Sequence, residues 1–61
     1  MEQGTLDSLQ LAKNLLDEAT MRYRQGYIHT TLDALSMARL RIEEAISIDS
    51  ELQHYATAHK T

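Results

Sequence analysis

Two stripes of apolar residues, one on each side of Gly26, repeat at the three-and-four spacing of an α-helix. The first stripe consists of Leu9, Ala12, Leu16, Ala19 and Tyr23, and the second consists of Leu35, Ala38, Ile42 and Ala45. This spacing places the side chains on one side of a helix, whereas a half-buried strand would show strict alternation. The sequence therefore predicts two amphipathic helices joined by a bend at the glycine.

The two stripes match each other when the chain folds back near residue 27. The matched pairs are Leu9 with Ala45, Ala12 with Ile42, Leu16 with Ala38, and Ala19 with Leu35. Each pair joins one large and one small side chain, which lets antiparallel helices interdigitate at a shallow crossing angle. We therefore expect these residues to form the seam of a helical hairpin and its core.

Capping and turn residues predict the bounds of the first helix. Thr5 is placed to accept a hydrogen bond from an orphan backbone N–H, so we expect the helix over about residues 6–25. Gly26 can end it, because glycine adopts the left-handed conformation without a Cβ penalty. The bend is then expected at about residues 26–29.

The second helix is expected at about residues 31–48, where Thr30 begins a sequence that resembles a capping box. Asp49 interrupts the apolar stripe and is followed by Ser50, another possible cap. We therefore expect a break near this point and a short or frayed helical extension over about residues 51–58.

At 61 residues the chain is a single domain, of a size that buries only about 60% of the surface its unfolded form exposes. It has no cysteine, so neither a disulfide nor a thiolate zinc site can support it. Apolar residues off the seam, including Leu32, Met37, Leu40 and Ile46, cannot be covered by two helices. Burying six such side chains would contribute on the order of 10 kcal/mol before entropic costs. We therefore expect an all-α antiparallel hairpin that dimerises into a four-helix bundle.

Composition disfavours several functional classes. The formal net charge of −3 and the sequence pI near 5.4 argue against a general affinity for nucleic acid. No apolar run approaches the roughly 20 residues needed to span a bilayer, and the first residues lack the features of a signal peptide. These features predict a cytoplasmic protein without a membrane segment.

The pattern of titratable residues favours neither an enzyme nor a metal site. Glu51 and His54 have the spacing that di-iron helical bundles use, but they lie off the apolar stripe and lack further inward carboxylates. Glu43 and Glu44 are adjacent, and neighbours on a helix point about 100° apart, so they cannot share a proton. We expect no catalytic residues, no metal and no cofactor.

Charge is segregated along the chain. Arg22, Arg24, Arg39 and Arg41 stand against the single acid Asp33 between positions 22 and 41. The structural interpretation is stabilisation of a helix end by the first two and exposed salt bridges for the other two. The functional interpretation is a basic half that steers an acidic partner or RNA.

Tyr27 and His29 lie in the bend, where no apolar stripe requires them. Tyrosine and arginine are enriched at binding hot spots, so these two residues with Arg22 and Arg24 form the preferred contact site. The first hypothesis is a homodimeric adaptor, inhibitor or regulator that binds another protein. The alternative is an RNA- or DNA-binding bundle whose arginine-rich half, including Arg39 and Arg41, contacts the phosphates.

Residues 34–50 resemble the second helix of a tetratricopeptide repeat. Ala38, Ile42 and Ala45 occupy its small and large packing positions, and residues 48–50 resemble its usual ending. The first-helix signature of that family is missing, and a single unit cannot stack. The resemblance therefore implies similar helix packing, not membership of the family.

Overall fold

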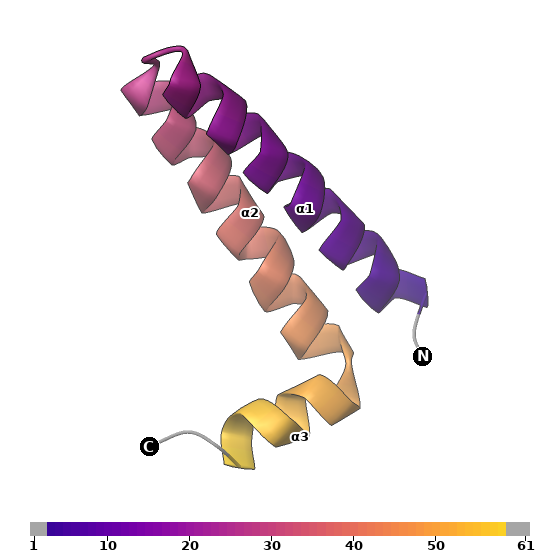
Figure 1. Cartoon of the computed structure of the whole chain (residues 1–61). Helices are drawn as coiled ribbons and strands as arrows, with labels where there is room; N and C mark the ends of the chain where they lie inside the picture. The colour runs from indigo at the N-terminus through magenta and orange to yellow at the C-terminus, as the bar shows by residue number, and fades with distance from the viewer. Residues whose placement is uncertain (1–2, 59–61) are drawn as a thin grey trace.

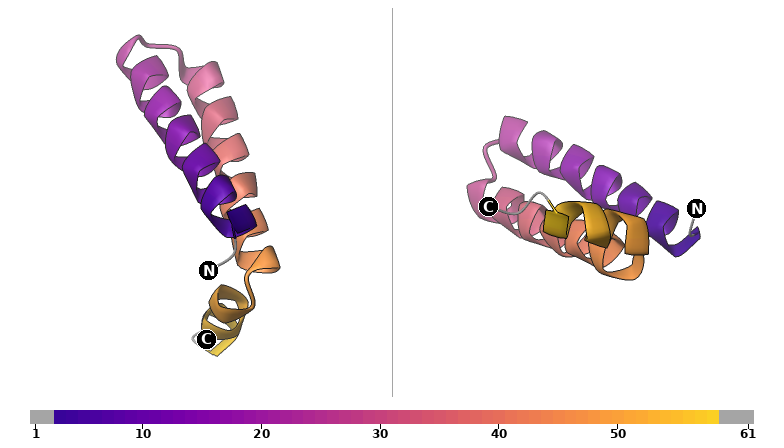
Figure 2. Two further views of the ribbon diagram at one scale, coloured as in Figure 1. Left: turned by 90° about the vertical axis from the view of Figure 1, so that its right-hand side faces the viewer. Right: turned by 90° about the horizontal axis from the view of Figure 1, so that it is seen from below.

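The computed structural model describes residues 3–58, which form three helices and no strand (Figure 1). They are α1 (Gln3–Arg24), α2 (Ile28–Ile48) and α3 (Ser50–Ala58). α1 and α2 lie side by side and antiparallel, whereas α3 turns away from the end of α2 (Figures 1 and 2). The prediction of an all-helical chain with two closely packed helices is confirmed.

The bend is a Schellman motif built on Gly26. This residue has φ of 86°, in the left-handed region that favours glycine. Its N–H donates to the carbonyl of Tyr23 at 3.0 Å, and the N–H of Tyr27 donates to the carbonyl of Arg22 at 3.0 Å. α1 thus ends beside the glycine, as the turn chemistry predicts.

Both long helices begin before the threonines expected to cap them. Thr5 lies inside α1, and its hydroxyl donates to the Asp49 carboxylate at 3.0 Å instead of capping its own helix. α2 begins at Ile28, directly after the bend, and its N-cap Tyr27 makes no side-chain cap hydrogen bond. The Thr30 hydroxyl donates back to the Tyr27 carbonyl at 3.3 Å, so the expected capping box is wrong.

Asp49 separates α2 from α3. Its extended backbone, with φ of −106° and ψ of 114°, ends α2 at Ile48. Its side-chain Oδ1 accepts a hydrogen bond from the N–H of Leu52 at 3.0 Å, which caps the start of α3. The expected break is therefore present, but Asp49 rather than Ser50 supplies the cap.

Small side chains line the seam between α1 and α2. The buried residues are Thr5, Ser8, Ala12 and Ala19 on α1, and Thr31, Ala34, Ala38 and Ala45 on α2. The alanines of the expected pairs are therefore buried. The large members lie at the edges of the seam: Leu9, Leu16, Leu35 and Ile42 are 44%, 42%, 43% and 39% exposed.

This difference from the expected large–small layers has a steric reason. Small residues on both helices let the two backbones approach, and a leucine between them would force them apart. The seam is therefore filled by alanine, serine and threonine. The leucines and isoleucines are left on the two outer faces of the hairpin.

The hairpin is consequently a single layer of helices. The Cα atoms occupy an envelope of 38 × 29 × 12 Å, and Figure 2 shows the two long helices side by side in one layer. Among residues 3–58 the buried apolar side chains are all alanines. Because domains normally bury side chains between two packed layers, this hairpin has only half of the usual arrangement.

Candidate interaction surfaces

One outer face of the hairpin carries large uncharged side chains. We call it the leucine face; it consists of Leu9, Leu16 and Tyr23 of α1 with Leu35 and Ile42 of α2. On each helix these residues recur every seven positions, and Leu9 and Leu35 directly follow the buried seam residues Ser8 and Ala34. In antiparallel helix pairs such equivalent positions lie on the same side of the seam. All five side chains are between 39% and 67% exposed.

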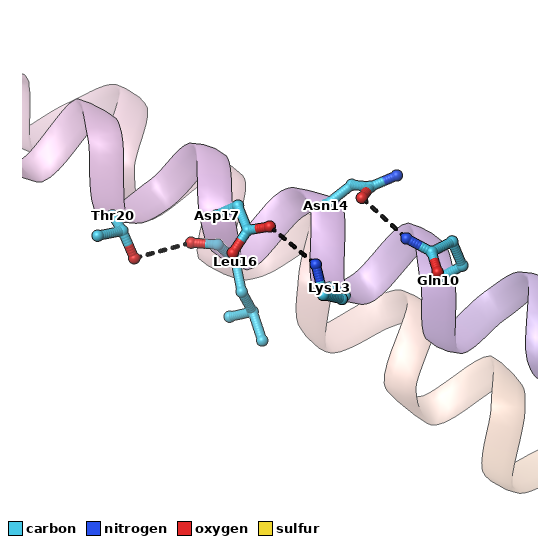
Figure 3. Close-up of polar contacts among 6 residues, drawn as sticks. All are labelled: Gln10, Lys13, Asn14, Leu16, Asp17 and Thr20. Carbon is cyan, nitrogen blue, oxygen red and sulfur yellow. Dashed lines mark hydrogen bonds and ion pairs between the residues drawn. The ribbon is translucent and has the colours of Figure 1, made fainter.

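The opposite face carries a shallow groove with a mixed lining. We call it the groove face; it consists of Leu11, Asn14, Leu15 and Glu18 of α1 with Met37 and Arg41 of α2. Figure 3 shows Asn14 and Leu16 pointing to opposite sides of α1, in agreement with their assignment to opposite faces.

Charged side chains on the groove face are held in ion pairs. Glu18 pairs with Arg22 at 3.0 Å, and Arg41 pairs with Glu44 at 3.4 Å. Glu44 also accepts a hydrogen bond from the Ser8 hydroxyl at 2.8 Å, across the seam. Polar groups on this face are therefore bound to one another, and covering the face would remove several charges from water.

Around the leucine face, the charges occur as pairs within a helix. Lys13 pairs with Asp17 at 3.3 Å, and Arg39 pairs with Glu43 at 3.4 Å. The first of these pairs appears in Figure 3, beside the hydrogen bond from Gln10 to Asn14. Both pairs are largely exposed, so they contribute little to stability, and each adds one charge of either sign to the rim. At the open end of the hairpin, Asp49 and Glu51 line a hollow together with Leu9.

Of the four contact residues predicted at the bend, one is held by other residues of the chain and three are exposed. Arg22 is half-buried, pairs with Glu18 and donates to the Thr30 carbonyl at 3.0 Å. Arg24, Tyr27 and His29 are exposed, with Tyr27 at 60%. The bend therefore offers an aromatic ring, an imidazole and one arginine to a partner.

The predicted arginine-rich half is not gathered into one patch. Arg39 and Arg41 lie in the middle of α2, away from the bend. They are two positions apart, so they point about 200° apart around the helix. Each pairs with a glutamate of its own helix, Arg39 with Glu43 and Arg41 with Glu44.

Asp49 is the one described carboxylate with a clearly shifted pKa. The N–H of Leu52 donates to it and the Thr5 hydroxyl adds a second hydrogen bond, so its pKa is lowered despite some desolvation. Sequence reasoning missed this link between α1, α2 and α3, because it read Thr5 as a helix cap.

Within residues 3–58, no three histidine, cysteine, aspartate or glutamate side chains come together in a group that could hold a metal ion. Glu51 and His54 lie on the exposed helix α3. Glu43 and Glu44 have separate arginine partners. No described helix has the length and apolar character needed to cross a membrane.

Comparisons of the chain with protein-family models, with curated proteins and with solved structures found no match.

Proposed function

We propose that the chain is a cytoplasmic, non-enzymatic protein-interaction module that acts as a homodimer. Two hairpins pack into a four-helix bundle, and the assembly binds another protein as an adaptor, inhibitor or regulator. The observation that carries this proposal is the single-layer hairpin, in which alanines fill the seam while every leucine of the two expected stripes stays exposed.

The dimensions of the hairpin support a second layer. The Cα radius of gyration is 13.4 Å, whereas a compact domain of this length would have about 10.5 Å. A compact protein of twice the length would have about 13.7 Å. The single chain thus has nearly the radius of gyration of a compact protein of twice its length. A second copy stacked on it would supply the missing thickness.

The bend is the proposed contact site for the other protein. Arg24, Tyr27 and His29 are exposed and lie at the bend, the closed end of the hairpin (Figure 1). Tyrosine and arginine are among the residue types enriched at binding hot spots. In a bundle, this end would remain accessible while a face is covered.

The test has two parts. Light scattering over a range of concentrations should give a mass near twice 7.0 kDa. A binding protein identified by affinity capture should then bind the purified chain at a fixed ratio, and the double variant Arg24→Glu, Tyr27→Ala should lose that binding. The double variant Gln53→Glu, His54→Ala, which adds a negative charge and removes a ring on the exposed helix α3 away from the bend, is the matched control. A monomer at all concentrations, or a complex indifferent to the bend variant, would refute the corresponding part.

Nucleic-acid binding through Arg22, Arg24, Arg39 and Arg41 has less support. Three of these arginines are paired with glutamates of their own helices, and the four do not share one surface. If this alternative were correct, the chain would bind RNA or DNA with an affinity that falls steeply with salt. Reversing Arg39 and Arg41 to glutamate would then abolish the binding.

A further inference from the structure

We infer that the leucine face is the dimer interface and that the groove face points outward. The occupant of the leucine face is a second copy of this chain, related by a two-fold axis. This inference rests on the proposed homodimer and adds to it which surface is buried.

The exposed area agrees with one buried face per chain. The accessible surface of the chain is 4985 Å², whereas a compact monomer of 7.0 kDa would expose roughly 4,000 Å². The excess is therefore roughly 1,000 Å². A standard stable interface buries about 800 Å² from each partner. Covering one face of the hairpin would remove about this excess, so the available area suffices for a stable dimer.

Desolvation distinguishes the two faces. The five side chains that define the leucine face carry no charge. Two of the six side chains that line the groove, Glu18 and Arg41, are charged, so burying the groove face would bury them together with their ion pairs to Arg22 and Glu44. Removing such charges from water costs several kcal/mol per ion unless new partners compensate. The pairs beside the leucine face, Lys13 with Asp17 and Arg39 with Glu43, lie at its rim. The leucine face is therefore the less costly surface to bury.

Symmetry requires a surface that matches itself. A two-fold pair brings the same patch of both copies together, so an excess of one charge would repel. The rim pairs Lys13 with Asp17 and Arg39 with Glu43 contain both signs on the same helix, which avoids that repulsion along this part of the rim. The helix α3 has no buried residue and lies beyond the open end of the hairpin (Figure 1), where Ser50, Glu51 and Leu52 line a hollow with Leu9.

Two substitutions on α2 provide a matched test. Leu35 on the leucine face and Met37 on the groove face are both 43% exposed. We expect Leu35→Glu to raise the dimer dissociation constant at least a hundredfold in sedimentation equilibrium, because it places two charges in the interface. We expect Met37→Glu to change it less than threefold.

A measurement on the unsubstituted chain guards against a variant that merely unfolds. In a mixture of isotope-labelled and unlabelled copies, methyl groups of Leu16, Leu35 and Ile42 should give intermolecular NOEs, and the methyl group of Met37 should give none. Intermolecular NOEs from Met37, with dimerisation lost only in Met37→Glu, would overturn the face assignment while the homodimer stands. A chain that is monomeric at every concentration would overturn the homodimer, and the inference with it.

Discussion

Alanine at the seam determines where every larger side chain of the hairpin must go. Ala12, Ala19, Ala34, Ala38 and Ala45 are all at most 4% exposed. A methyl side chain lets the opposing backbone approach closely, and the many short contacts that result replace the contacts of large side chains. The cost is that the large residues of the two stripes, Leu9, Leu16, Leu35 and Ile42, stay outside the seam, so their apolar surface remains available for association.

Enlarging one seam residue should therefore destabilise the hairpin. Ala38 is 1% exposed, and we expect Ala38→Leu to lower the free energy of unfolding by about 1–3 kcal/mol, because the helices must separate to admit the larger side chain. Urea denaturation followed by circular dichroism measures this. Glu43→Gln, which removes only one exposed ion pair, should change it by less than about 0.5 kcal/mol. Equal effects would show that the seam is misplaced.

The Asp49 carboxylate should make the α3 junction sensitive to acid. Its pKa is lowered by the N–H of Leu52 and then by the hydroxyl of Thr5. A lowered folded-state pKa means that the stabilisation is complete above the ordinary aspartate value of about 3.9 and is lost as the pH falls through the lowered value. We expect the Leu52 amide resonance to titrate with a midpoint below the pKa of an ordinary aspartate.

Thr5→Val tests the cause of this shift. Valine keeps the shape of threonine but cannot donate to Asp49, so the midpoint of the Leu52 titration should move upward. Asp49→Asn should abolish the titration altogether. An unchanged midpoint in Thr5→Val would mean that the hydroxyl does not contribute to the low pKa.

At the scale of the helices, the glycine turn was predicted correctly from the sequence, whereas the threonine caps and part of the seam were not. Gly26 predicted the end of α1 because its turn depends on neighbouring residues only. The start of α1 was misjudged because the hydrogen bond of Thr5 goes to Asp49, far along the chain. The four alanines of the predicted seam are buried, but its large residues are exposed. Ser8 and Leu9, or Ala34 and Leu35, belong to stripes of the same spacing. Periodicity alone cannot choose between them, and hydrophobicity favoured the leucines.

The bend offers a test of the element boundary. Gly26 has φ of 86°, and a Cβ there would meet no atom within 4 Å, so only backbone strain opposes a side chain. We expect Gly26→Ala to lower the free energy of unfolding by about 1 kcal/mol. Gly26→Asn should lower the free energy of unfolding by less, because asparagine tolerates the left-handed conformation better than alanine does. Thermal unfolding of both variants beside Gln25→Ala, a neighbouring change without this constraint, gives the comparison.

At the scale of the whole molecule, the hairpin buries the small residues of its seam but leaves large apolar side chains exposed on its outer faces. The candidate partner residues at the bend lie together, whereas Arg39 and Arg41 lie elsewhere and on different sides of α2. Their role in binding a partner stays a prediction. The separation of Arg39 and Arg41 follows from their two-residue spacing on a helix. The sequence-based prediction took account only of the number of arginines in this segment and not of the directions in which they point. The excess of exposed apolar surface was predicted, but its division between two faces depends on the alanine seam.

If the second layer is another copy, folding and association must be linked. A dimer that unfolds to separate chains gains stability with concentration, by about 1.4 kcal/mol for each tenfold increase. For a dimer of this size that corresponds to a rise in melting temperature of about 5 °C per tenfold increase. We expect circular dichroism melts over a hundredfold range to shift by about 10 °C, whereas a folded Leu35→Glu monomer should melt independently of concentration. A melting temperature of the unsubstituted chain that did not change with concentration would mean that the hairpin is stable alone, and that its leucine face is free for a different protein.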